Sequence, residues 1–579
     1  MKKSVILFIL ISISAMPAYS MMEITVEAEN PVKAYTRVLG QEELNLLKPA
    51  DTADAIKSLT EINVISRGLG TVQGDIIISA GTYEQAAVTL DGVRINDPQT
   101  GHYSADIPVT SLDTASVSIN TGAAASGFGA FTGSVGVETR GIAKDEVRLK
   151  GEYGTYNTWL SALSAAKTAG DFYASISAEK SGSDGYRKET DFMKNTVFFK
   201  TGYKNNTLSL AYQDKNYGAY DFYTPGKNMP SREFLITRYA ALDLQPWEFL
   251  SIKPYYRYHY DKFILNNDKP SYYRNMHNTA VYGADAKVPL KFNDNISARV
   301  KAGLRREEIQ SSSFKNHYRA SGEADAALSA VFLDDFTLYV QGVLASYNTT
   351  ADTEFMHSAS LEWKGLQVIK FYAGYSQSAR YPSFTELYYS DPFTQGSTGL
   401  KPERNFECRA GLNMDVGAVE LSADGMLRYS QGLIDWGKEN VSDLKWTIAN
   451  RGESDTASLT FLLKMPFSIF NLSAGHTYTD SYSRASYIPK YGANYLKNKF
   501  FASVDFQLYG VTSFFCYTHK NYDERNDAFN SFDASLSYVF GGIVTASLKC
   551  ENIANMYYEE IKGIPAPGRV IKASVLTEF

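Results

Sequence analysis

The feature that most constrains this chain is a two-residue alternation of apolar and polar side chains, which extends from about residue 146 to the C-terminus. Near its start Val147 and Leu149 flank Arg148, and the pattern returns at 208–212 and 532–540. Successive side chains of a β-strand point to opposite faces, so each such strand has one apolar and one polar face. At roughly ten residues per strand plus turns, this region is long enough for about 22 strands.

The composition is consistent with strands at a membrane boundary. Aromatic residues make up 13% of the chain, with 41 Tyr and 32 Phe, and amphipathic rings suit an apolar–aqueous interface. A large sugar-binding β-protein would also be rich in them. Beyond the first twenty residues no apolar run is long enough for a spanning helix, so a membrane location requires a closed β-barrel, the other fold that pairs every backbone polar group in lipid. A soluble β-propeller is the alternative fold, but the sequence has no blade-length repeat.

The first twenty residues are predicted to be a secretory signal peptide. Lys2 and Lys3 precede the apolar run 5–13, and Ala18-Tyr19-Ser20 forms a small-x-small cleavage site. The apolar run is shorter than the roughly 20 residues that a spanning helix needs. Cleavage removes both lysines and changes the formal net charge from −6 to −8. No basic tract indicates nucleic-acid binding.

Residues 31–143 differ from the rest of the chain and are predicted to form a compact α+β domain. Asp51 is a helix cap for residues 52–59, and Asp91-Gly92 is a two-residue hairpin signal. Further strands are predicted at 116–119 and 135–139. A barrel of about 22 strands leaves a lumen that is either open or filled, and this domain is the candidate filling.

The connections between the predicted strands are of two kinds. Short turns are rich in Asn and Asp, as at 204–206 and 293–295, and long ones are rich in Tyr, Arg, Pro and His, at about 214–238, 259–278, 380–400 and 478–498. Outer-membrane barrels have short turns on one side and long loops on the other. The last strand ends on the aromatic Phe579, which is similar to the signature by which such barrels are recognised for assembly.

A specific family resemblance covers the mature chain. Residues 76–140 resemble the plug of TonB-dependent receptors, and barrel motifs agree at 379–389 with 399–403, at 551–560 and at Pro567-Gly568-Arg569. The resemblance implies an all-β transmembrane barrel of about 22 antiparallel strands with an N-terminal α+β plug inside it, in the outer membrane of a Gram-negative type of cell. We expect a signal peptide at 1–20, a TonB box segment at 21–30, a plug at 31–143 and a barrel at 144–579.

The resemblance also implies an energy-coupling segment near the mature N-terminus. It is similar to the family's TonB box and comprises Glu23, Ile24, Thr25, Val26, Glu27 and Ala28. An extended segment of this kind pairs its backbone with the edge of a partner's sheet, here TonB, which acts with ExbB and ExbD of the inner membrane. An ordinary disordered terminus is the alternative.

Ligand contacts are expected at the plug apex and on the outer loops. On the plug the candidates are Gly70, Thr71, Gln73, Asn96, Asp97, Gln99 and His102, although Gly and Pro in these loops also make turns. On the barrel loops they are Tyr220, Tyr223, Arg257, His259, Tyr273, His277, Arg380, Tyr381 and Tyr389, although many tyrosines belong to the interfacial belt. Aromatic and Arg side chains together suit a planar or anionic chelate. For His259 and His277, haem ligation and simple solvation are the two alternatives.

The expected ligand is a ferric siderophore or cobalamin. Haem, an oligosaccharide and passive porin function are the alternatives. No Ser- or Cys-centred catalytic motif accompanies the seven His, so we expect no enzyme. Three Cys without metal-ligand spacing predict neither a disulfide framework nor a metal site. We expect no cofactor, a lipid-embedded monomer and no nucleic-acid partner.

The sequence departs from the family pattern in the plug. Ser79-Ala80-Gly81 and Thr121-Gly122 stand where the family carries Arg before Gly, and Arg409 stands where a barrel Glu is usual, although Glu403 remains. Loss of one partner of a buried ion pair is destabilising. A chain that lacks the plug arginines is therefore expected to lack their barrel carboxylate partners as well. We expect this plug to be anchored by hydrogen bonds and fewer ion pairs.

The coupling role of the N-terminal segment is testable by proline substitution. Thr25→Pro or Val26→Pro removes a backbone donor and is expected to abolish uptake while leaving ligand binding unchanged. Cell uptake and surface binding of the same radiolabelled ligand measure the two effects. Full uptake by either variant would exclude the coupling role.

Overall fold

The computed structural model describes residues 35–125, 129–349, 353–484, 487–490, 495–523 and 528–579. The expected signal peptide (1–20) and TonB box segment (21–30) lie outside the described residues. Within the described ranges, no helix has the length and apolar character needed to cross a membrane.

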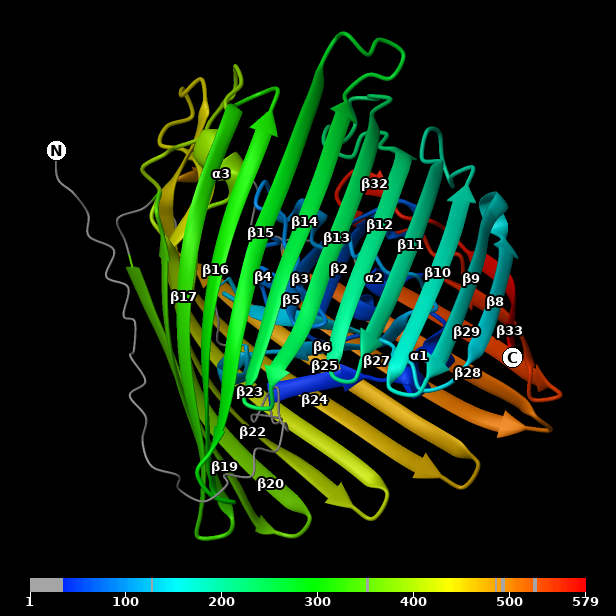
Figure 1. The fold of residues 1–579 in the computed structure, drawn as a ribbon. Coiled ribbons are helices and arrows are strands. Elements are labelled where there is room, and N and C mark those ends of the chain that lie inside the picture. The colour runs from blue at the N-terminus through cyan, green and yellow to red at the C-terminus, as the bar shows by residue number, and fades with distance from the viewer. Residues whose placement is uncertain (1–34, 126–128, 350–352, 485–486, 491–494, 524–527) are drawn as a thin grey trace.

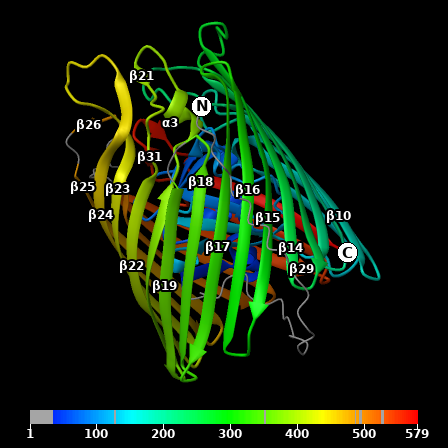
Figure 2. The same cartoon turned by 60° about the vertical axis from the view of Figure 1, so that its left-hand side comes forward.

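Twenty-two long antiparallel strands close into a barrel, because the last strand pairs with the first, as the sequence predicted (Figures 1 and 2). They are β8 (Glu146–Gly154), β9 (Thr158–Ala169), β10 (Phe172–Ser183), β11 (Phe192–Tyr203), β12 (Asn206–Gly218), β13 (Arg232–Trp247), β14 (Leu250–Ile264), β15 (Arg274–Lys291), β16 (Ile296–Ser311), β17 (Lys315–Phe332), β18 (Phe336–Tyr347), β19 (Thr353–Leu366), β20 (Ile369–Arg380), β22 (Glu403–Val416), β23 (Val419–Lys438), β24 (Trp446–Phe467), β25 (Phe470–Ser483), β27 (Leu496–Leu508), β28 (Val511–Tyr522), β29 (Ala528–Phe540), β30 (Val544–Glu551) and β33 (Val570–Glu578). Short strands in the long connections are β21 (Thr394–Gln395), β26 (Ile488–Pro489), β31 (Glu559–Ile561) and β32 (Ile564–Pro565).

The two faces of the barrel strands differ as the alternation predicted. Val147 and Leu149 of β8 are 40% and 45% exposed on the outside, whereas Arg148 between them is 6% exposed and faces the lumen. Leu210, Leu344, Leu459 and Leu536 continue the exposed apolar surface around the barrel. This surface is the one that contacts lipid, and the polar face is covered by the plug.

The strand connections confirm the predicted asymmetry and correct its extent. Turns at one end are short, as at 170–171 and 204–205, and the long connections gather at the other end, as at 219–231 and 381–402 (Figure 1). The expected loops 214–238 and 259–278 are too long, because β12 to β15 continue into them. Arg257, His259 and His277 therefore lie on strands rather than on loops.

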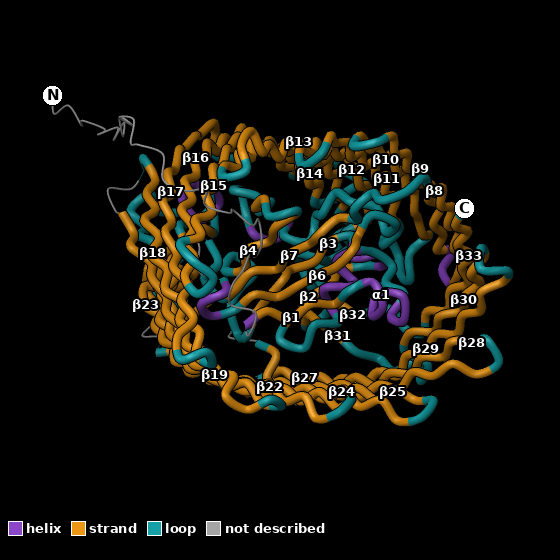
Figure 3. The backbone as a smooth tube through the Cα atoms, turned by 60° about the horizontal axis from the view of Figure 1, so that its bottom comes forward, coloured by secondary structure: helices purple, strands orange, loops and turns teal. Residues whose placement is uncertain are grey.

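The plug fills the lumen (Figure 3). Its five-stranded sheet has the order β1-β6-β7-β4-β5, and β2 and β3 form a separate hairpin. Its elements are β1 (Thr36–Leu39), α1 (Gln41–Leu47), α2 (Thr52–Lys57), β2 (Ile62–Arg67), β3 (Gln73–Ile78), β4 (Ala86–Leu90), β5 (Val93–Arg94), β6 (Thr114–Asn120) and β7 (Gly133–Thr139), with 3₁₀ turns η2 (Leu69–Thr71), η3 (Gly101–Tyr103) and η4 (Gly122–Ala124).

Local signals in the plug fold as predicted. The Asp51 side chain accepts a hydrogen bond from the Asp54 backbone N–H and caps α2. Asp91 and Gly92 adopt φ of 47° and 77°, the left-handed pair that a tight hairpin between β4 and β5 requires. Ile56, Ile76 and Val135 pack in the buried core between the helices and the sheet.

Ion pairs anchor the plug to the barrel wall, and most of them join a carboxylate of the plug to a cation of the barrel. Seven plug carboxylates pair with barrel cations: Glu43–Lys464 (2.9 Å), Asp51–Lys194 (3.2 Å), Asp54–Lys549 (3.6 Å), Glu84–Arg380 (4.0 Å), Asp91–Lys200 (3.8 Å), Asp97–Arg257 (2.7 Å) and Asp106–Lys215 (2.6 Å). Lys57–Glu560 and Arg140–Glu146 (both 3.7 Å) have the reverse polarity. Ion pairs therefore anchor the plug beside the hydrogen bonds, and the expectation of fewer pairs than in the family stays a prediction.

The plug positions that lack arginine are approached by arginines of the barrel. Arg428 of β23 donates to the backbone carbonyl of Ser79, and Arg409 of β22 lies against Gly122 while pairing with Glu407 and Asp424. At both places the guanidinium group near the plug backbone is carried by the barrel wall. Ser79 and Ala80 adopt φ of 42° and 58°, a left-handed conformation that costs roughly 1–2 kcal/mol per L-residue.

Restoring the family's arginine at residue 80 is a test of this exchange. We expect Ala80→Arg to weaken plug docking by about 2 kcal/mol, because it places a second cation beside Arg428. Ala80→Glu is the matched control and is expected to maintain or strengthen docking. The force needed to extract the plug from the purified protein measures both, and a clear gain in Ala80→Arg would contradict the exchange.

Candidate functional site

A cavity of about 40 Å³ lies at the loop end of the lumen, between the plug and the barrel wall. On the plug side it is lined by Glu84, Asn96 and Asp97, and on the barrel side by Arg319 and Arg380. The plug residues come from the turn before β4 and from the loop after β5, so the hairpin at Asp91-Gly92 holds both segments at one place. The lining is charged and polar, with rings from Tyr347 and Tyr381.

Arg380 is the centre of an ion-pair network on the wall of this cavity. Its Nη1 and Nη2 bind the two Glu386 oxygens at 2.8 and 2.9 Å, and its Nε binds Glu403 at 2.6 Å. Glu84 of the plug is 4.0 Å from the same guanidinium. Burial, and then the neighbouring Glu386 carboxylate, raise the pKa of Glu84 to about 7.

The outer loop 381–402 is attached directly to the plug apex. Its short helix α3 (Phe384–Tyr388) is capped by Ser383 and Glu386. The first two N–H groups of α3 are not satisfied within the helix, and they donate instead to the plug carbonyls of Pro98 and Gln99 at 2.9 and 3.0 Å. A change in the position of this loop therefore acts on the plug through hydrogen bonds.

Asp97 fixes the plug loop to the opposite part of the wall. It accepts from Arg257 at 2.7 Å and from the hydroxyl of Thr279 at 2.9 Å, and it is 5% exposed. Burial alone would raise the pKa of Asp97, but the Arg257 guanidinium and the hydrogen bonds outweigh it and hold the pKa below its ordinary value. Asp97 is therefore an anchor that stays ionised at neutral pH.

Aromatic rings surround the plug apex. Tyr83 and His102 stack with ring centroids 4.0 Å apart, and His102 Nδ1 is 2.9 Å from Asp75. On the outer loops, Tyr273 and Tyr389 share a hydrogen bond of 3.1 Å. Tyr388 stacks on His317 of β17 at 3.6 Å between centroids. These rings are partly exposed and form a surface above the buried ion pairs.

Two family models match the chain. The model described as TonB dependent receptor-like, beta-barrel, matches residues 87–553, and the TonB-dependent receptor plug domain matches residues 30–135. The chain belongs to the TonB-dependent receptors. Its barrel is that of an outer-membrane protein. Members of this family are receptors and transporters rather than enzymes.

Solved structures of receptors and transporters share this fold at low sequence identity. The siderophore receptor PirA from Acinetobacter baumannii is 13% identical, with 96% of this chain and 100% of that chain covered and a TM-score of 0.76. The FrpB iron transporter from Neisseria meningitidis is 12% identical (94% and 99% covered, TM-score 0.79). The copper transporter OprC is 14% identical (94% and 99% covered, TM-score 0.79). No curated protein matches the chain.

The structure of this TonB-dependent receptor separates the expected ligand residues into two groups. Some are partly exposed at the loop end: His102, Tyr220, Tyr223, Tyr273 and Tyr389. Others are engaged inside the protein: Gly70 against Phe192, Thr71 in η2, Gln73 with Tyr223, Asn96 with Ala86 and Val88, Asp97 with Arg257, Gln99 with Asp261, Arg380 with Glu386, and Tyr381 with Ala345. The second group holds the plug and the loops in place.

His259 and His277 are buried, so the expectation that they are solvated is wrong. His259 is fully buried, with Nδ1 3.0 Å from Thr237, and His277 is 4% exposed and stacks on Phe314. Three site residues were missed by sequence reasoning: Tyr83, Glu84 and His317. The adjacent Tyr83-Glu84 pair precedes a predicted strand and could have drawn attention, whereas His317 lies in an alternating strand with no local signal.

Glu84 predicts a pH dependence of plug docking near neutrality. In the folded protein the pKa of Glu84 is about 7, above the ordinary value of 4.5. The contribution of Glu84 to the stability of the docked plug is therefore complete below pH 4.5 and is lost as the pH rises through about 7. We expect the plug extraction force to fall between pH 6 and pH 8.5 in the unaltered protein and to change less in Glu84→Gln. Glu43→Gln, at the opposite end of the plug, is the control and should retain the full pH dependence. Equal pH profiles for Glu84→Gln and the unaltered protein would contradict this assignment.

Proposed function

We propose that this receptor imports a scarce ligand, a ferric siderophore or cobalamin, using energy that TonB transmits from the proton gradient of the inner membrane. The observation that carries the proposal is the aromatic surface at the loop end, made by Tyr83, Tyr223, Tyr273 and Tyr389 around the plug apex. Conjugated or planar ligands stack on such rings. Family members whose names state a siderophore or iron cargo support the same class.

The proposed binding step uses the partly exposed rings, with the buried arginines as supports. Tyr223 is 38% exposed, whereas Arg257 and Arg380 are 2% and 4% exposed and already paired. A ligand that displaced these guanidinium groups would leave buried carboxylates without partners, which costs several kcal/mol. Binding above the ion pairs avoids this cost and leaves the plug attached.

The proposed coupling step passes from the outer loop to the plug. A ligand that contacts Tyr388 and Tyr389 changes the position of α3, which donates hydrogen bonds to Pro98 and Gln99. The plug, taken as residues 31–143, then shifts toward a state that presents segment 21–30 to TonB. Such a shift requires the ligand to bind the two states with different affinity.

Direct binding to a panel tests the proposal. Purified receptor is titrated with a ferric catecholate, a ferric hydroxamate, cobalamin, haem and a maltooligosaccharide. One of the first three is expected to bind, and Tyr223→Ala or Tyr389→Ala is expected to weaken its Kd about tenfold through lost stacking. Tyr509→Ala is the matched control, because Tyr509 is 92% exposed in a short turn at the opposite end. If only haem or the oligosaccharide binds, that compound replaces the siderophore or cobalamin as the proposed ligand. If the resting barrel is open and conducts ions, passive porin function is favoured instead.

A further inference from the structure

One segment of the barrel wall differs from the rest in what it presents to the plug. The lumen-facing residues of β24 and β25 are hydroxyl side chains that pair across the two strands: Thr456 with Ser481 (2.8 Å), Ser458 with Thr479 (3.1 Å) and Thr460 with Thr477 (3.1 Å). We call these six residues the hydroxyl strip. At about 3.4 Å per residue the strip extends about 14 Å along the strands.

The hydroxyl strip is not attached to the plug. Among the described residues, no hydrogen bond or ion pair joins its six side chains to the plug. Each hydroxyl group is satisfied across the strand pair instead. The neighbouring strands behave differently, since Arg428 of β23 donates to Ser79 and Lys499 of β27 donates to plug carbonyls. β24 is itself attached to the plug near its short-turn end, where Lys464 pairs with Glu43. The hydroxyl strip is therefore a stretch of wall between polar anchors that can part from the plug without breaking a polar contact of its own.

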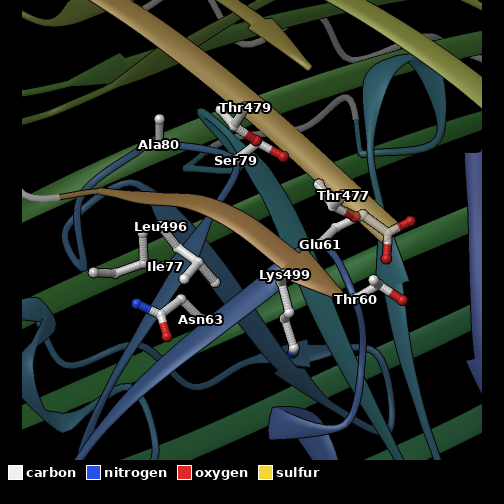
Figure 4. Close-up of a pocket in the computed structure, with 10 residues that line it drawn as sticks. All are labelled: Thr60, Glu61, Asn63, Ile77, Ser79, Ala80, Thr477, Thr479, Leu496 and Lys499. Atoms are coloured by element: carbon white, nitrogen blue, oxygen red, sulfur yellow. The ribbon is translucent and has the colours of Figure 1, made fainter. Parts of the chain in front are cut away.

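A cavity already lies at this contact (Figure 4). It is lined by Thr477 and Thr479 of the strip, by Thr60, Glu61 and Ser79 of the plug, and by Lys499. Most of the lining is small or polar, with apolar side chains at Ile77 and Leu496. Ser79 and Ala80, which form the left-handed turn described above, contribute short side chains to the plug side of the cavity.

Three buried polar atoms near this contact have no hydrogen-bond partner in the described part of the chain. Glu61 is 8% exposed and lines the cavity; its Oε1 pairs with Arg37, but its Oε2 accepts nothing. Arg428 is 4% exposed, and its Nε and Nη1 donate no hydrogen bond. Buried polar groups are usually satisfied, so these atoms have capacity to bind water or a polar solute, as do other buried atoms of the plug–wall contact such as Arg257 Nε.

We infer that the seam between the plug and the hydroxyl strip is the permeation path of this receptor, and that it takes hydrophilic solutes rich in hydrogen-bonding oxygen atoms. The inference rests on the proposed transport function and adds the location of the path. Hydroxyl groups exchange their mutual hydrogen bonds for bonds to a passing solute with little net change. Arg428 and Lys499 flank the seam and favour a solute with anionic groups.

Lys499 closes the seam in the resting protein. Its Nζ donates to the carbonyls of Lys57, Leu59 and Ile62 at 2.8, 2.5 and 2.9 Å. These carbonyls lie between the end of α2 and the start of β2, so this ammonium group, together with the Lys57–Glu560 ion pair, holds the plug segment that covers the cavity. Removal of this group is expected to open the seam while the anchors on the other walls remain.

The test measures KCl conductance of the mature chain in planar bilayers and needs neither ligand nor TonB. For this test Cys408, Cys516 and Cys550 are first replaced by serine, so that the thiol reagent reacts only with an introduced cysteine. We expect Lys499→Met to raise the conductance several-fold over the unaltered protein. We also expect a bulky polar thiol reagent to close the leak when Thr479→Cys is added. Heat-dependent migration in detergent gels confirms that each variant retains a folded barrel.

Ser376→Cys is the matched control. Ser376 is a small hydroxyl residue of β20 that is as buried as Thr479, and Asn405 of the adjacent β22 holds the plug at Phe131. The reagent should leave the leak unchanged in this variant. Any of three results would overturn the inference. The first is a Lys499→Met conductance equal to that of the unaltered protein. The others are a leak that the reagent does not reduce with Thr479→Cys, or an equal reduction with Ser376→Cys and Thr479→Cys. A failed ligand panel with a blockable leak would overturn only the proposed cargo.

Discussion

The structure depends on the matching of charges between the plug and the inner wall of the barrel. A barrel of this width has a polar lumen, and its lysines and arginines are removed from bulk water once the plug occupies that lumen. Burial of such groups is tolerable only when they are paired. The plug supplies carboxylates at Asp51, Asp97 and Asp106, and the wall supplies Lys194, Arg257 and Lys215. The interface is therefore specific, because each buried carboxylate has its own cation on the wall.

The same principle explains the exchange of arginines. Ala80 and Thr121 leave the plug without cations at two places, and Arg428 and Arg409 approach those places from the wall. A guanidinium group is required near the Ser79 carbonyl and near the Glu407 and Asp424 carboxylates, but the backbone that carries it is not fixed by the physics. The consequence is a plug surface at Ser79-Ala80 made of short side chains. That surface lines one cavity with Thr477 and Thr479 of the hydroxyl strip, whose six side chains make no hydrogen bond to the described part of the plug.

The two ends of the lumen have distinct roles in this arrangement. At the loop end, Arg380 joins α3, β22 and the plug in one ion-pair network, and aromatic rings remain partly exposed above it. The proposed ligand contacts and the plug attachment thus use neighbouring but different side chains. Toward the short-turn end, the plug is held by exposed pairs such as Glu43–Lys464, which contribute at most about 1 kcal/mol each. The gradient from buried to exposed anchoring favours movement that begins at the N-terminal side.

The sequence by itself determined the barrel, because period-two alternation over so many residues has few other folds, and it determined the Asp51 cap and the Asp91-Gly92 turn, because these are local. Motifs also identified the plug. Only the tertiary structure decided which candidate side chains are free. Arg257, His259 and Arg380 have the residue types of ligand contacts, but strand length and the partners Asp97, Thr237 and Glu386 bury them. Pairing between residues far apart in the sequence, such as Asp97 with Arg257, leaves no local signal. For that reason the charge polarity of the plug and the position of the hydroxyl strip appeared only in the folded chain.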